Sequence, residues 1–157
     1  MNRQFKNIIN LLIIFLLSVA QITLMPYFSI LDLWPNLIFL LAVSFILIGA
    51  EREAYLTASF GGLILDLVSP IFFGFNVLVM MFLTGLTQLL TKKLLSDINF
   101  FIAGLVYIVA SLLFNLVFSF TGHQFDWLAL NIGIVYSLII GLIMFYTLNN
   151  WYDRREL

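Results

Sequence analysis

Long runs of almost uncharged, apolar residues recur along this 157-residue chain. Several exceed about 18 residues, the length that a helix needs to cross about 30 Å of hydrocarbon. Hydrophobic residues make up 63% of the sequence and charged residues only 10%, which leaves too little polar surface for a soluble domain. We therefore predict an all-α, polytopic membrane protein with a single integral membrane domain.

The apolar runs predict six transmembrane helices. The expected spans cover residues 8–25, 37–50, 54–69, 72–91, 100–120 and 128–148. The first run lacks a small-x-small cleavage site, so we expect it to be retained as a span rather than removed as a signal peptide.

The basic residues favour one orientation. With six spans and a cytoplasmic N-terminus, all seven Lys and Arg residues fall on the cytoplasmic side, which is the side that such residues prefer. A five-span alternative, with 54–69 as a re-entrant loop, would place some of them outside. We therefore expect six spans with both termini in the cytoplasm.

One acidic residue falls inside a predicted span. Asp66 follows the glycine pair Gly61-Gly62 by one helical turn. A carboxylate at the centre of a membrane helix costs roughly 2.5–3.5 kcal/mol, so it normally has a polar partner or a water-filled cavity. From its depth in the span, we expect Asp66 to lie near Asn76 of the next span, and Asn115 is a second candidate.

Three interpretations of Asp66 remain open from sequence alone. The glycine pair and the acid can serve close helix packing, with one buried hydrogen bond that fixes the register of two helices. The acid can bind a proton or an ion, as intramembrane acids of transporters do. It can also contact the helix of a partner protein. No other predicted span contains Lys, Arg, His or Glu, which counts against a proton relay.

Small residues repeat along the faces of several predicted helices. In the last span, Gly133, Ser137 and Gly141 recur every four residues, a spacing that lets another helix backbone approach closely. A similar stripe precedes Asp66 at positions 54, 58 and 62. Any stripe that is not used inside the bundle is available for a partner's helix.

No pattern in the sequence indicates catalysis or cofactor binding. The chain has no cysteine, and His123 lies with Gln124 and Asp126 in an expected outer loop, which offers too few ligands for a metal. No phosphate-binding glycine motif is present, and the scattered basic residues do not indicate nucleic-acid binding. We expect a protein that is not an enzyme and has no cofactor or metal.

An ordered set of residues resembles the bacterial rod shape-determining protein family MreD. In that family a proline opens the second span, an acid follows, and the pattern G-x-x-x-G-L-x-x-D leads through a short break into G-x-N. The corresponding residues here are Pro35, Glu53, Gly62, Leu63, Asp66, Gly74 and Asn76, with Pro70 in the break. Ala58 replaces the earlier glycine, and the first span and the last two match only in being apolar.

The resemblance implies a non-enzymatic scaffold of the cell-elongation complex in the bacterial plasma membrane, where peptidoglycan synthesis maintains rod shape. It implies MreC as the direct partner. It further implies MreB, RodZ, RodA and a class B penicillin-binding protein as members of the complex.

The resemblance also supplies an alternative function. The fold of the MreD family resembles the six-helix substrate-binding subunits of energy-coupling-factor (ECF) vitamin transporters. Such a subunit needs an outward pocket with converging polar groups. The expected outer loops hold polar and aromatic residues, among them Asp32 and Trp34, but the first span has only Ser18 and Ala20 where those subunits often carry an alanine-x-x-x-alanine patch.

Overall fold

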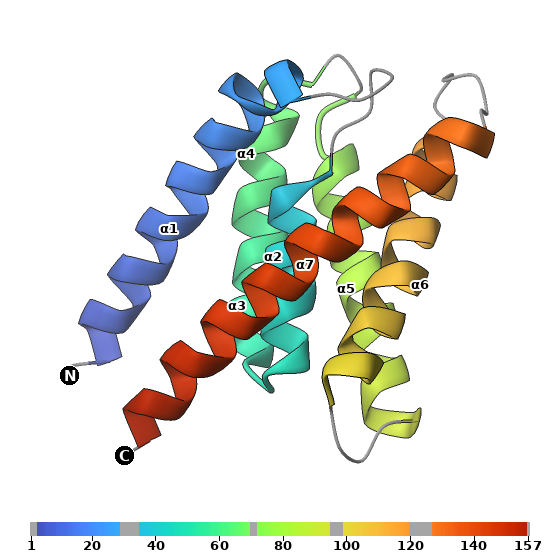
Figure 1. Ribbon diagram of the computed structural model, residues 1–157. Helices are drawn as coiled ribbons and strands as arrows, with labels where there is room; N and C mark the ends of the chain where they lie inside the picture. Colours follow the sequence, from blue (N-terminus) through green and yellow to red (C-terminus); the bar gives the residue numbers. More distant parts are fainter. Residues whose placement is uncertain (1–2, 29–34, 70–71, 95–98, 120–126, 157) are drawn as a thin grey trace.

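The computed structural model describes residues 3–28, 35–69, 72–94, 99–119 and 127–156. Within these ranges the chain is helical and contains no strand, which confirms the all-α prediction (Figure 1). The longer helices are α1 (Arg3–Thr23), α5 (Phe75–Leu94), α6 (Phe100–Ser119) and α7 (Trp127–Glu156). The helix α2 (Leu37–Leu47) is shorter, and a 3₁₀ turn, η1 (Met25–Phe28), follows α1.

One further helix changes geometry along its length. It consists of α3 (Glu51–Leu56), the π-helical turn η2 (Thr57–Gly61) and α4 (Gly62–Asp66), which follow one another without a break. A π-helical turn contains more residues than an α-helical turn, so it rotates the faces of the residues that follow it. We call this unit the composite helix.

Successive helical segments run in opposite directions. Both termini, the turn before the composite helix, and the meeting ends of α5 and α6 lie at the bottom of Figure 1. We call this the basal end. The opposite end, where α1 and α4 finish and α2 and α5 begin, is the apical end.

Among the described residues, three helices are long and apolar enough to cross a membrane, so the protein has the character of an integral membrane protein. These stretches are Phe75–Lys92, Phe100–Val117 and Asn131–Trp151, and two shorter apolar helices cover Ile8–Thr23 and Leu37–Leu47. The 11 residues of α2 extend only about 16 Å, roughly half of the hydrocarbon thickness. Six spans therefore stay a prediction.

The structure moves several of the expected boundaries. α4 ends at Asp66 rather than at residue 69, α5 covers Phe75–Leu94 rather than 72–91, and α7 continues to Glu156 rather than to residue 148. The segment predicted at 37–50 stops being helical at Leu47, because the chain turns at Gly49, whose φ of 77° suits glycine. The next helix then begins at Glu51 rather than at residue 54. Two acids in its first turn, Glu51 and Glu53, stabilise this start because the helix dipole is positive there.

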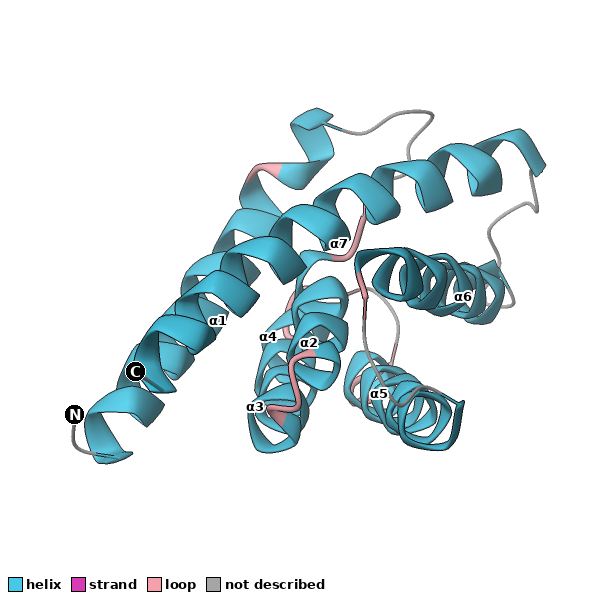
Figure 2. Cartoon of the chain, turned by 60° about the horizontal axis from the view of Figure 1, so that its bottom comes forward, coloured by secondary structure: helices cyan, strands magenta, loops and turns pink. Residues whose placement is uncertain are grey.

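The short helix α2 forms the centre of the bundle. All of its residues are buried, and it contacts α1, the composite helix, α5, α6 and α7. Figure 2, in which the basal end comes forward, shows α2 enclosed by these neighbours. A helix that is apolar on every side is typical of a site away from water, and the enclosed position of α2 fits its composition.

The small-residue stripe of α7 faces the interior. A Cβ atom at Gly141 would lie 2.6 Å from Cδ1 of Tyr107 on α6, so only glycine fits against this ring. Ser137 is buried, and Gly133 is half-buried. The Tyr107 hydroxyl lies 2.6 Å from Oγ of Ser44 on α2, so the ring joins three helices.

Candidate functional site

The carboxylate of Asp66 is buried and fully engaged by α5. Only 4% of the residue is exposed. Its Oδ1 accepts hydrogen bonds from the backbone N–H and the side-chain Nδ2 of Asn76, both at 2.9 Å. Its Oδ2 accepts one from the backbone N–H of Val77 at 3.1 Å. The expected contact between Asp66 and Asn76 is therefore confirmed.

These bonds make Asp66 the cap of a helix other than its own. α5 begins at Phe75, so the N–H groups of Asn76 and Val77 belong to its first turn. Such groups have no partner within the helix, and the positive end of the helix dipole favours a negative charge beside them. The carboxylate at the end of α4 therefore accepts hydrogen bonds from N–H groups that would otherwise lack a partner at the start of α5.

The turn between α4 and α5 requires a glycine immediately before α5. Gly74 has a backbone φ of 95°, a conformation that residues with a Cβ atom rarely adopt. The backbone N–H of Phe75 bonds to the carbonyl of Phe72 at 3.3 Å, and these two aromatic rings pack edge to face. Pro70 lies outside the described residues.

The glycine pair allows two close contacts in different directions. A Cβ atom at Gly62 would lie 2.9 Å from Cα of Val77, so the backbones of α4 and α5 meet here directly. A Cβ at Gly61 would instead collide with Ile38 of α2. The pair therefore places α4 against both α5 and α2, which brings Asp66 within reach of the start of α5.

A second helix start is capped across the bundle in the same way. Oε1 of Gln21, on α1, accepts a hydrogen bond from the backbone N–H of Leu37 at 2.7 Å, and its Nε2 donates to the carbonyl of Pro35 at 3.2 Å. Asn36 caps α2 locally by accepting from the N–H of Phe39. No sequence pattern described above singled out Gln21, although a lone amide late in an apolar run was a usable signal.

A small cavity lies near these caps, between described residues of α2, α6 and α7. Its volume is about 20 Å³, and Pro35, Asn115, Gly133 and Ser137 are among the residues that line it. This space suits about one water molecule, whereas pockets for small organic ligands measure roughly 300–1,000 Å³.

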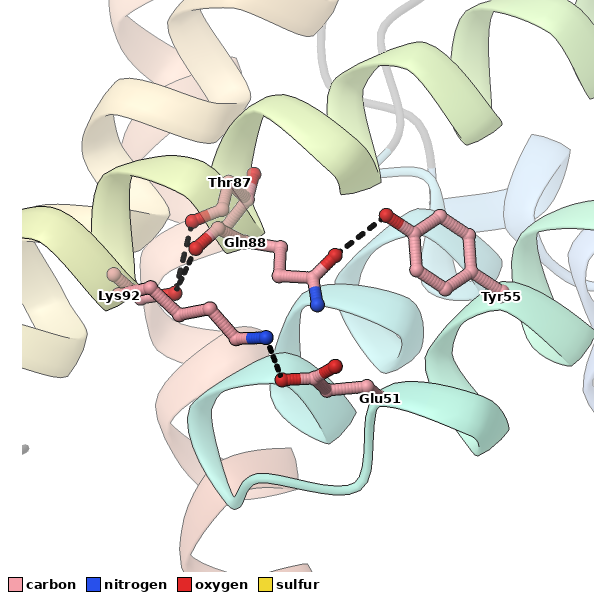
Figure 3. A network of polar contacts seen from close by, with 6 residues as sticks. Glu51, Tyr55, Thr87, Gln88 and Lys92 are labelled. Atoms are coloured by element: carbon pink, nitrogen blue, oxygen red, sulfur yellow. Dashed lines mark hydrogen bonds and ion pairs between the residues drawn. The ribbon is translucent and has the colours of Figure 1, made fainter.

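The composite helix is joined to α5 at the basal end by polar contacts (Figure 3). Nζ of Lys92 lies 2.6 Å from a carboxylate oxygen of Glu51, and the Tyr55 hydroxyl donates to Oε1 of Gln88 at 2.6 Å. Hydrogen bonds from Lys92 and Gln88 lower the pKa of Glu51. The ion pair between Glu51 and Lys92 therefore stabilises the fold above the ordinary carboxyl pKa, and this contribution disappears as the pH falls through the lowered pKa of Glu51. Solvent screens the pair, so its contribution is small.

The other predicted residues lie apart from the α4–α5 junction or outside the described ranges. Glu53 lies on α3 at the basal end. The expected loop residues Asp32, Trp34, His123, Gln124 and Asp126 lie outside the described residues. In the part of the chain that the structure describes, no group of three or more acidic or histidine side chains could hold a metal ion.

Comparisons with protein-family models, with curated proteins and with solved structures find no match for this chain.

We predict that Asp66→Asn destabilises the protein. The amide retains one acceptor oxygen but presents an NH₂ group to N–H donors, so at least one donor at the start of α5 loses its partner. The free energy of unfolding should fall by about 1–3 kcal/mol. Reversible unfolding in mixed detergent micelles measures it. Glu51→Gln, which removes an exposed acid, should have a smaller effect, and equal effects of the two variants would refute the capping role.

We also predict that Gly62→Ala is more damaging than Gly85→Ala. The methyl group at position 62 meets backbone atoms of Val77, which cannot move without separating α4 from α5. At position 85 the nearest atom is the Tyr55 hydroxyl, 3.4 Å from the added carbon. Overpacking of a tight contact costs about 1–3 kcal/mol. Thermal unfolding of both variants in one detergent tests this order, and a reversed order would contradict the close approach.

Proposed function

We propose that this protein is an MreD-like scaffold of the bacterial cell-elongation complex. In this role it binds MreC in the plasma membrane, associates with MreB, RodZ, RodA and a class B penicillin-binding protein, and supports peptidoglycan synthesis without being an enzyme. The proposal starts from the resemblance at Pro35, Glu53, Gly62, Asp66 and the G-x-N motif.

One observation favours a structural role for Asp66 over ion or proton transfer. The intramembrane acid uses both carboxylate oxygens to hold the first turn of α5. An acid that transfers protons or ions must release its hydrogen-bond partners to bind the proton or ion that moves along a pathway. Asp66 instead accepts from backbone N–H groups that have no other acceptor in their own helix. The motif residues thus support a rigid joint between two helices.

The proposed topology has six spans with both ends in the cytoplasm. The six helical segments alternate in direction, and Arg52 and Lys92 lie at the basal end, where both termini also lie (Figure 1). The short α2 is compatible with a span because other helices surround it, so the lipid does not need to match its length. These observations support a cytoplasmic basal end under the positive-inside rule.

The alternative function, a substrate-binding subunit of an ECF-type transporter, has less support. Such a subunit holds its vitamin in an outward pocket. The expected outer-loop residues Asp32, Trp34, His123, Gln124 and Asp126 lie outside the described residues. The lower rank therefore comes from the first span, which has only Ser18 and Ala20 where those subunits often carry an alanine-x-x-x-alanine patch.

Copurification tests the scaffold role directly. We expect the tagged protein, extracted from native membranes in mild detergent, to bring MreC with it, and its depletion to convert rods into rounded cells. When the Asp66→Asn variant is expressed in depleted cells, it should restore rod shape only to the extent that the variant accumulates as folded protein. Capture of two ATPases with a large membrane coupling subunit would overturn the scaffold in favour of the transporter. A well-folded but inactive Asp66→Asn would contradict the purely structural role of Asp66 and favour either ion or proton binding or a direct contact with a partner.

Single cysteines test the six-span topology. The natural chain contains no cysteine, so it provides an unlabelled control. We expect a membrane-impermeant maleimide to label Tyr27→Cys in intact spheroplasts, and to label Ala50→Cys and Asn99→Cys only after permeabilisation. External labelling at position 50 would mean that α2 does not cross the membrane. External labelling at position 99, with position 50 protected, would mean that one of the two segments between them, the composite helix or α5, does not cross.

A further inference from the structure

The composite helix and α5 form a hairpin whose two arms are tied together at both ends. At the basal end, Nζ of Lys92 lies 2.6 Å from a carboxylate oxygen of Glu51 (Figure 3). At the apical end, the carboxylate of Asp66 accepts hydrogen bonds from Asn76 and Val77 in the first turn of α5. The two arms therefore begin and end at matching levels, and we call this unit the tied hairpin.

The tied hairpin is short for a membrane of ordinary thickness. At about 1.5 Å per residue, the composite helix extends about 22 Å from Glu51 to Asp66, and α5 extends about 24 Å from Asn76 to Lys92. Any tilt of the arms shortens their projection on the membrane normal. Since the hydrocarbon layer is about 30 Å thick, one end of the hairpin lies roughly 6 Å inside it when the other end is at its surface.

The charged residues hold the basal end at the surface. The side chains of Glu51 and Lys92 are 41% and 58% exposed, and Arg52 beside them is also exposed. Charged groups are costly in hydrocarbon. A lysine can extend its ammonium group toward the surface from a deeper position, but the shorter glutamate has little reach of this kind. The missing length therefore falls on the apical end.

The apical end of the hairpin carries an apolar outer surface. We call residues 67–69 and 72–74 the apical turn, and none of them is charged. Four large apolar side chains of this turn are mostly exposed: Leu67 (70%), Val68 (60%), Phe72 (68%) and Phe73 (65%). A cluster of this kind is unfavourable in water and marks a contact with a partner or with lipid.

The backbone around the apical turn has its acceptors within the protein. Three N–H groups just after α4 donate to carbonyls of α4, and three at the start of α5 donate to Phe72 or to Asp66. These six groups belong to Leu67, Val68, Ser69, Phe75, Asn76 and Val77. An unpaired backbone group is costly where water is absent, so internal acceptors are what a turn in hydrocarbon requires.

From these features we propose that the apical turn lies inside the hydrocarbon of the leaflet opposite the basal end, where lipid acyl chains cover its four exposed side chains. Asp66 then caps α5 below the membrane surface, where no water replaces it as an acceptor. The inference rests on the proposed crossing of the membrane by both arms, which the labelling at positions 50 and 99 examines separately. It does not depend on the scaffold role.

The depth of single fluorophores tests this placement. Bimane is attached to cysteines introduced into the full chain, which has none of its own, at exposed positions: Leu67→Cys and Phe73→Cys in the turn, Phe82→Cys near the middle of α5, and Tyr27→Cys in η1. Each variant is reconstituted in dioleoyl phosphatidylcholine, with iodide on both sides of the bilayer as the aqueous quencher. Lipids with a nitroxide near the glycerol or near the end of the acyl chain report depth.

We expect the two turn positions to be quenched most by the nitroxide near the glycerol and to lose quenching by iodide. Phe82→Cys should respond most to the deep nitroxide. Tyr27→Cys should remain accessible to iodide, because η1 lies farther from the basal end than the start of α5 (Figure 1).

A thinner bilayer provides a matched condition. In dimyristoleoyl phosphatidylcholine, whose acyl chains are shorter, the hydrocarbon is closer to the length of the tied hairpin. Quenching by iodide should therefore appear at Phe73→Cys, while Phe82→Cys stays protected and Tyr27→Cys stays accessible.

Two results would overturn the proposal. Equal iodide quenching at Phe73→Cys and Tyr27→Cys in the dioleoyl lipid would mean that the turn lies in water or that the bilayer thins to meet it. Protection from iodide without quenching by either nitroxide would mean that protein, such as a second copy of the chain, covers the turn. Thermal unfolding of each labelled variant in detergent checks that the comparison is made on folded protein.

Discussion

The first turns of buried helices impose the strongest constraint on this bundle. Backbone N–H groups at a helix start have no partner in their own helix, and in an apolar environment an unpaired polar group costs several kcal/mol. Both α2 and α5 begin at the apical end beside other helices. Gln21 accepts from Leu37 at the start of α2, and Asp66 accepts from Val77 at the start of α5. Each start thus depends on a side chain of the preceding helical segment, which couples the helices in chain order.

The same constraint explains why an acid is tolerated in the interior of the bundle. A carboxylate is costly in hydrocarbon, but at position 66 it faces three N–H donors and the positive end of the α5 dipole. An amide could not accept from all three. The contact also requires the absence of side chains at Gly62, where the backbones meet, and the left-handed turn at Gly74. The acid, the two glycines and Asn76 therefore act as one unit that holds α4 on α5.

Sequence patterns predicted the helical segments and the contact between Asp66 and Asn76, because hydropathy and the depth of a residue in a span are local properties. They did not predict that the backbone of α5 provides two of the donors, since this depends on where α5 starts relative to α4. No pattern in the sequence predicted the π-helical turn η2 either. Gln21 was missed because its partner lies 16 residues away, at Leu37, across a segment without periodicity.

The small residues of the bundle are used internally, and this limits how a partner can bind within the membrane. Gly61, Gly62 and Gly141 all face other helices of the chain. The outer faces carry large side chains instead, such as Phe82 on α5 and Ile143 on α7, both exposed. Lipid tails are as apolar as these groups, so burial alone does not favour a partner helix over lipid. In the proposed scaffold role, specificity for a partner therefore depends on polar groups and aromatic side chains at the two ends of the bundle, where the helices reach the membrane surface.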